Sequence, residues 1–110
     1  MEDIIAEKLR ALLQQTIRDR NRPQDVYDIA RYWQEPNADL DTAKISDYLK
    51  RKSNLRDIAV TKSSFDASVC EKAAFDYEKR IMDQASSHFL SFDDAWTNVL
   101  DLVKSLDIPD

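Results

Sequence analysis

The chain has 110 residues, 43% of them hydrophobic, which suffices for one domain with a modest core but includes no run of about 20 apolar residues that could span a membrane. The formal net charge of −5 argues against a dedicated nucleic-acid-binding arm. The chain contains no glycine, which phosphate-binding loops need for close approach of the backbone to the anion, so a P-loop and a dinucleotide-binding fingerprint are both excluded.

Apolar residues recur at helical spacing along the chain, and no segment shows a convincing strand pattern. We therefore expect an all-α fold: a single domain over residues 1–110, built as a bundle of about five helices. The lack of glycine agrees with this fold, because glycine weakens a helix interior by about 1 kcal/mol relative to alanine. The helices are expected near residues 3–18, 23–34, 40–52, 65–86 and 91–106.

The first three helices follow from apolar spacing and from residues suited to helix ends. The first is predicted from apolar residues that recur at spacings of three and four as far as Ile17. The second begins near Pro23, which suits a first helical turn. The third is predicted to begin at an aspartate N-cap, either Asp39 or Asp41.

The segment SNLRDIAVTKSS follows the third helix and is predicted to be an irregular connection with at most one short turn. The fourth helix is the longest, and Ser63 or Ser64 is its expected N-cap. The fifth begins at Ser91, which is followed by Asp94 at the spacing of a capping box.

Lys8 has an unexpected position on the first helix. At about 100° per residue it falls between Ile4 and Leu12, on the apolar face. An unpaired buried ammonium is costly. Lys8 is therefore either a rim lysine, whose stem covers apolar surface while its head reaches water, or a lysine that points into a cleft to meet an anion.

Two acidic residues and a tyrosine share one stripe of the second helix. Asp25, Asp28 and Tyr32 lie at positions i, i+3 and i+7. The two carboxylates repel each other unless something compensates. One candidate is the positive end of the helix dipole, which compensates the charge of Asp25 fully and that of Asp28 partly. The other candidate is a cation, either Lys8 or a divalent metal, and the sequence pattern leaves both explanations open.

Other kinds of site find little support. With one histidine and one cysteine, the chain cannot form a zinc site. Cys70 is the single cysteine, so no internal disulfide can form, which favours the reducing cytoplasm.

The stretch EKLRALLQQ, followed by RDRNRPQDVYDIARY, resembles the third and fourth motifs of the AbiEii-type nucleotidyltransferase toxins, the toxin half of type IV toxin–antitoxin systems. In that family a K-L-x-A-L helix is followed by a loop and an R-x-x-D-x-Y-D helix. The later stretches FDYEKRI and SFDDAWTNVLDLVKSLDIP resemble the C-terminal region of the family. The resemblance covers nearly the whole chain and is most specific over residues 7–30.

The resemblance implies roles for individual residues. Lys8 matches the motif lysine, and Asp25 and Asp28 match the two motif aspartates, so these three are the candidate catalytic residues. Lys8 would contact the phosphates of a nucleotide. Asp25 would either orient Lys8 or activate the acceptor hydroxyl.

Many family members have an arginine shortly after the A-L of the third motif, where this chain has two glutamines. Arg18, Arg20 and Arg22 can supply positive charge around the phosphates instead. Arg18, Arg22 and Tyr32 are the candidate substrate-binding residues.

The family's first motif is a Gly-Ser pair followed by paired acids on a small α/β domain, where the acids hold magnesium ions. That domain would precede Met1, and no glycine is present to form the motif elsewhere in the chain. The resemblance thus implies a helical half that binds no metal or cofactor by itself and is inactive alone. Nucleoside triphosphate and magnesium would belong to a complete two-domain enzyme.

The expected partners follow from this division. They are a separately encoded N-terminal catalytic half or an antitoxin protein, and self-association through the first two helices is a further expectation. A nucleic-acid partner, tRNA, is implied only by the family resemblance. Two alternatives to a half-enzyme stay open: a stand-alone helical interaction module that binds a protein partner, and a plain structural domain without a site.

Overall fold

The computed structural model describes residues 1–35, 39–84 and 90–110, and within these ranges the chain forms six α-helices, one short 3-10 helix and no strand. This confirms the predicted all-α fold. None of the helices in this part has the length and apolar character needed to cross a membrane. The helices are α1 (Glu2–Leu13), α2 (Pro23–Gln34), α3 (Thr42–Asn54), η1 (Lys62–Ser64), α4 (Ala67–Ala74), α5 (Tyr77–Gln84) and α6 (Phe92–Ser105).

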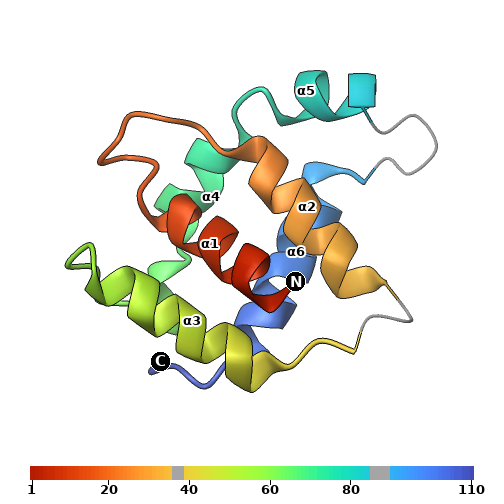
Figure 1. The fold of residues 1–110 in the computed structure, drawn as a ribbon. Helices are drawn as coiled ribbons and strands as arrows, with labels where there is room; N and C mark the ends of the chain where they lie inside the picture. The colour runs from red at the N-terminus through yellow and green to blue at the C-terminus, as the bar shows by residue number, and fades with distance from the viewer. Residues whose placement is uncertain (36–38, 85–89) are drawn as a thin grey trace.

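The helices pack as a bundle in which α1 lies between α2 and α3 (Figure 1). α1 and α2 run antiparallel as a hairpin. α2 also packs along α6 and contacts α5, while α4 contacts both helices of the hairpin. The hairpin is therefore the central element of the bundle, since it contacts each of the other four α-helices.

The apolar faces predicted from helical spacing form the core. On α1, Ile5, Leu9 and Leu12 are fully buried, at spacings of four and three residues. Burial of a side chain of this size stabilises a fold by about 1.5–3 kcal/mol. The fully buried members of the same cluster on later helices are Val26, Ile29, Ala30, Ile45, Leu49, Ala73, Ile81, Ala95, Val99 and Leu102.

Several predicted helix ends are confirmed. Pro23 lies in the first turn of α2. Asp41 is the N-cap of α3, where its carboxylate accepts a hydrogen bond from the N–H of Lys44 at 3.1 Å. Ser91 caps α6 in the same way, by accepting from the N–H of Asp94 at 3.1 Å.

The first helix is shorter than predicted, because α1 ends well before the expected boundary near residue 18. Successive tight turns follow and end at Asp19, whose φ of 50° is left-handed. The N–H of Asp19 bonds to the Thr16 carbonyl at 3.3 Å, and the N–H of Arg20 bonds to the Gln15 carbonyl at 2.9 Å, which is the Schellman pattern of a helix end. Ile17, predicted to be buried, is therefore 77% exposed.

Aspartate takes the left-handed positions that glycine usually fills. Asp19, Asp57 and Asp76 have φ angles of 50°, 55° and 60°, and no other described residue has a positive φ. After α3, the N–H of Ile58 bonds to the Ser53 carbonyl at 2.9 Å, and Asp57 holds the same Schellman position that Asp19 holds after α1. The short polar side chain of aspartate tolerates this conformation better than most others do.

The single long helix predicted over residues 65–86 is wrong. The segment forms two helices, α4 and α5, which are separated at Phe75 and the left-handed Asp76. The N-cap of α4 is Asp66, which accepts a backbone N–H at 3.1 Å, instead of either serine predicted before it. α4 contacts both α1 and α2, whereas α5 contacts α2. The break between α4 and α5 allows the chain to make both sets of contacts, which one straight helix does not. The predicted end, residues 85 and 86, lies outside the described ranges.

Candidate functional site

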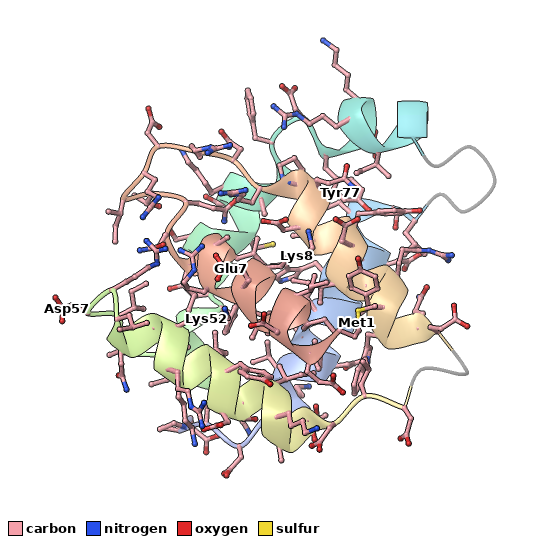
Figure 2. All side chains as sticks on the ribbon, in the orientation of Figure 1. Met1, Glu7, Lys8, Lys52, Asp57 and Tyr77 are labelled. Carbon is pink, nitrogen blue, oxygen red and sulfur yellow. The ribbon has the colours of Figure 1, made fainter. Side chains whose placement is uncertain are left out.

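The hairpin of α1 and α2 brings together the three residues predicted to be catalytic. Lys8 reaches from α1 toward α2 (Figure 2), and its Nζ lies 3.2 Å from Asp25 Oδ1 and 3.0 Å from Asp28 Oδ2. The two aspartates are three residues apart on one helix, so both face Lys8. We call these three residues the ion cluster. A cation, the ammonium of Lys8, thus compensates the two carboxylates.

Burial and charge act in opposite directions on Lys8, whose side chain is 22% exposed. Burial by itself lowers the pKa of the ammonium, but the hydrogen bond to Asp28 and the charge of Asp25 outweigh it and raise the pKa above its ordinary value. The second oxygen of Asp28 accepts from Gln24 Nε2 at 2.9 Å. Lys8 therefore stays charged at neutral pH, with two N–H groups bound by described residues and the third available to another acceptor.

Asp25 is the most buried member of the ion cluster, at 7% exposure. Its Oδ2 is covered by protein and has no hydrogen-bond partner among the described residues. Arg22 Nη1 lies 3.8 Å away, which is within ion-pair distance but too long for a hydrogen bond. An unsatisfied buried carboxylate oxygen is unfavourable and uncommon in folded proteins, so this position differs from an ordinary ion pair.

Arginines gather at the loop between α1 and α2. Arg10, Arg18, Arg20 and Arg22 line a small hollow together with Ala11, Gln14 and Gln15. We call this feature the arginine hollow. It contains Arg18 and Arg22, two of the three predicted substrate-binding residues, and it adjoins the ion cluster through the contact between Arg22 and Asp25.

Gln15 supports this loop, a role that the sequence analysis missed. The side chain is 2% exposed, and its Nε2 donates to the carbonyls of Leu12 and Val69 at 3.0 and 3.2 Å. Its Oε1 accepts from the N–H of Arg22 at 2.9 Å. One buried amide thus joins α1, α4 and the start of α2. In the sequence Gln15 lies between Gln14 and Thr16, so no local signal distinguished it from its polar neighbours.

Tyr32 does not join the ion cluster. It lines a second hollow of about 390 Å³ with Met1, Arg31 and Glu35, near the N-terminus of α1. Seven residues separate Tyr32 from Asp25, which corresponds to about 10 Å along a helix. The third predicted substrate-binding residue therefore lies toward the opposite end of the hairpin from the arginine hollow.

The carboxylates of the ion cluster do not suit a divalent metal. In the described part of the chain, no group of three or more His, Cys, Asp or Glu side chains is arranged to hold a metal ion. Magnesium requires several oxygen ligands in near-octahedral geometry, whereas here an ammonium lies between Asp25 and Asp28. No step through a metal can be assigned to these residues.

A second lysine forms a similar bridge at the surface. Lys52 of α3 lies 2.9 Å from Asp3 Oδ1 and 3.5 Å from Glu7 Oε2 on α1 (Figure 2). Its own side chain is 26% exposed, close to the value for Lys8, but those of Asp3 and Glu7 are 63% and 45% exposed. The two bridges differ mainly in the burial of their acids, which makes Lys52 a matched control for Lys8.

The family model that matches this chain is described as "Nucleotidyl transferase AbiEii toxin, Type IV TA system", and the match covers residues 1–102. The chain has no significant match among curated proteins or among solved structures. The matched range contains the whole ion cluster and the arginine hollow. The chain therefore belongs to the AbiEii family of nucleotidyltransferase toxins of type IV toxin–antitoxin systems.

Proposed function

We propose that this chain supplies the cationic part of a nucleotidyl-transfer site, in which Lys8 contacts a phosphate of a nucleoside triphosphate and Asp25 positions Lys8. The observation that carries the proposal is an ammonium held between two carboxylates, one of them 7% exposed, with one N–H available to a ligand. Membership of a nucleotidyltransferase family supports the choice of reaction.

In nucleotidyl transfer, an acceptor hydroxyl attacks the α-phosphorus, the bond to the bridging oxygen breaks and pyrophosphate leaves. The hydroxyl proton passes to a base, and negative charge builds on the phosphoryl oxygens. A fixed positive charge lowers this barrier, because it stabilises the transition state more than the ground state. The raised pKa of Lys8 keeps its charge in place throughout the neutral range.

Of the two roles that the family resemblance implies for Asp25, positioning fits the geometry better. Oδ1 binds Lys8, and Oδ2 is covered by protein, so neither oxygen is placed to take a proton from an acceptor hydroxyl. Asp28 has a more exposed side chain, at 24%, and its two oxygens bind Lys8 and Gln24. Asp25 and Asp28 therefore hold the ammonium of Lys8 in one place for its ligand.

The magnesium ligands and the Gly-Ser motif would come from another polypeptide segment. No glycine occurs in these 110 residues, and the ion cluster does not suit magnesium. We propose that this chain works in the cytoplasm with a partner that carries those motifs. Since the family belongs to a toxin–antitoxin system, an antitoxin protein is a second expected partner. An RNA acceptor such as tRNA stays a prediction.

The test is to co-express the chain with an N-terminal domain that carries the Gly-Ser and paired-acid motifs, and to measure transfer of labelled nucleotide to RNA. Lys8→Met is expected to lower turnover at least about 100-fold, as loss of a transition-state donor does. Lys52→Met, the matched control, should leave turnover unchanged. Equal activity of Lys8→Met and the parent would show that the proposal is wrong.

The alternative is an interaction module without catalytic function. The observation in its favour is that the large apolar side chains of Ile17 and Phe75 are 77% and 62% exposed, so a partner protein can contact them. Under this alternative, the chain binds its partner, no combination of the two transfers nucleotide, and Phe75→Ser weakens binding while Lys8→Met does not.

A further inference from the structure

An exposed, partly apolar surface lies at the open end of the α1–α2 hairpin, away from the loop that joins the two helices. It surrounds the hollow of about 390 Å³ that is lined by Met1, Arg31, Tyr32 and Glu35. Figure 2 shows Met1 beside α2. Ile4 lies one helical turn from Lys8, on the stripe of α1 that faces α2. We call the surface formed by Ile4 and the four lining residues the hairpin-end face.

The apolar part of the hairpin-end face is accessible. Met1 and Ile4 are 53% and 47% exposed, and Tyr32 is partly buried against the core. Methionine and tyrosine are enriched in the buried centres of protein–protein interfaces, because they supply a large contact area. The centre of this face therefore has the composition of an interface.

The two charged residues of the hairpin-end face have opposite signs. Arg31 and Glu35 are four residues apart, so their side chains leave α2 on the same side. Neither forms an ion pair with another described residue. A helical pair with the cation before the anion is the weaker of the two possible orders, which agrees with this arrangement. Both charges are therefore available to a binding partner.

A face with one cation and one anion around an apolar centre is complementary to a second copy of itself. In a symmetric dimer, residue i of one copy contacts residue j of the other, and j contacts i. A two-fold axis through the hollow thus places Arg31 of each copy opposite Glu35 of the other. The face contributes no net charge, so the two copies meet there without local repulsion, although each chain has a formal net charge of −5.

We propose that the hairpin-end face is the interface of a symmetric dimer of this chain. Met1 and Ile4 of each copy pack near Tyr32 of the other, and two pairs of Arg31 with Glu35 flank this apolar centre. A partner of uniform charge would match only one of the two charged residues, whereas a second copy matches both. The interface leaves the arginine hollow accessible, because that hollow lies toward the opposite end of the hairpin.

The dimer is expected to be weak. Stable dimers bury at least about 600 Å² on each copy, roughly a tenth of the 6435 Å² accessible surface of this chain. The hairpin-end face offers three large apolar side chains to such an area. In analytical ultracentrifugation, the chain should sediment as a monomer near about 1 μM and increasingly as a dimer toward about 1 mM.

Reversal of one charge tests the pairing across the axis. Arg31→Glu and Glu35→Arg should each weaken self-association at least about tenfold, because each places like charges opposite one another. An equimolar mixture of the two variants should associate again as a one-to-one heterodimer, since the acids of one copy then face the bases of the other. The controls Lys104→Glu and Asp101→Arg make the same charge changes at exposed positions of α6 and should alter affinity less than about twofold.

A second pair of variants tests the apolar centre. Ile4→Asn should weaken self-association at least about tenfold, as loss of a central apolar contact does. Ile17→Asn is the matched control, because Ile17 is 77% exposed but lies in the loop at the other end of the hairpin. It should leave the dimer unchanged. Circular dichroism verifies that every variant is folded.

The inference is overturned if the parent chain remains a monomer at about 1 mM. It is equally overturned if the mixed charge-reversal variants fail to associate, or if Ile17→Asn weakens association as much as Ile4→Asn does. None of these measurements includes a nucleotide or a partner domain. Failure of the dimer is therefore distinct from failure of the proposed function, which is judged by turnover.

Discussion

Replacing Lys8 with methionine is expected to destabilise this chain. From the helix pattern alone, the change would be neutral or stabilising, because it removes a charge from an apolar face. The contacts reverse this expectation. Lys8 supplies a hydrogen bond to each of two carboxylates, and Asp25 is 7% exposed. Without Lys8, the nearest cation to Asp25 among the described residues is Arg22, whose Nη1 lies 3.8 Å away.

The magnitude follows from the burial of the ion cluster. Exposed ion pairs contribute about 0.2–1 kcal/mol, whereas removal of one partner from a fully buried pair costs about 3–5 kcal/mol. The side chains of Lys8, Asp25 and Asp28 are 22%, 10% and 24% exposed, so the cluster is intermediate. We expect Lys8→Met to lose about 2–3 kcal/mol of the free energy of unfolding, or roughly 10–20 °C in Tm.

Lys52→Met is the control, since Lys52 also bridges two carboxylates, but those of Asp3 and Glu7 are 63% and 45% exposed. Water solvates these carboxylates after the substitution. The expected loss is therefore at most about 1 kcal/mol.

The assay is urea denaturation at neutral pH of the parent, Lys8→Met, Asp25→Asn and the double variant. The double variant, Lys8→Met/Asp25→Asn, should be at least about 1 kcal/mol more stable than the sum of the two single losses predicts, because the uncompensated buried charge of Asp25 is gone.

The pH dependence of the stability that Lys8 supplies has a definite sign. Because the pKa of Lys8 is raised by folding, its stabilisation is fully present below the unfolded value of 10.5 and is lost as pH rises through the folded pKa.

Two results would refute this reasoning. One is that Lys8→Met loses no more of the free energy of unfolding than Lys52→Met does. The other is a coupling energy between Lys8 and Asp25 below about 0.5 kcal/mol, the level at which independent sites add.

Three further predictions concern stability. Burial raises the pKa of Tyr77 above its ordinary value of 10.0, so stability should fall by about 1.4 kcal/mol per pH unit above pH 10, and in alkaline urea titrations Tyr77→Phe should lack this component. Asp57→Gly should gain up to about 1 kcal/mol of stability at its φ of 55°, whereas Asp101→Gly, at an exposed position of α6, should lose a few tenths of a kcal/mol; Tm shifts of the same sign in thermal unfolding would contradict this. Gln15→Ala should lose about 2–3 kcal/mol of the free energy of unfolding in urea, and Gln24→Ala, which removes one hydrogen bond to the partly exposed Asp28, less than about 1 kcal/mol; equal losses would contradict the anchoring role.

The fold class and most helix positions could be predicted from the sequence because helical spacing repeats locally. Ile5, Leu9 and Leu12 lie at spacings of four and three, and all are fully buried. The N-caps Asp41 and Ser91 were predictable for a similar reason, since the donor that each accepts lies only three residues away.

The ends of α1 and α4 were not predictable from local signals. No glycine or proline marks either end, and aspartate is compatible with both helical and left-handed backbone. Asp19 and Asp76 are left-handed in the folded chain, where the neighbouring segments pack against different helices. Tertiary packing therefore decided where the backbone leaves the helix.

The sequence by itself determined which residues carry charge and which helix face each one occupies. It placed Lys8 on an apolar face and two aspartates on one stripe of the next helix, and left their partners open. The antiparallel packing of α1 and α2 decided that Lys8 meets both Asp25 and Asp28, 17 and 20 residues away. Helical periodicity defines the direction of a side chain relative to its own helix axis, whereas a contact between helices depends on how the whole bundle buries its apolar surface.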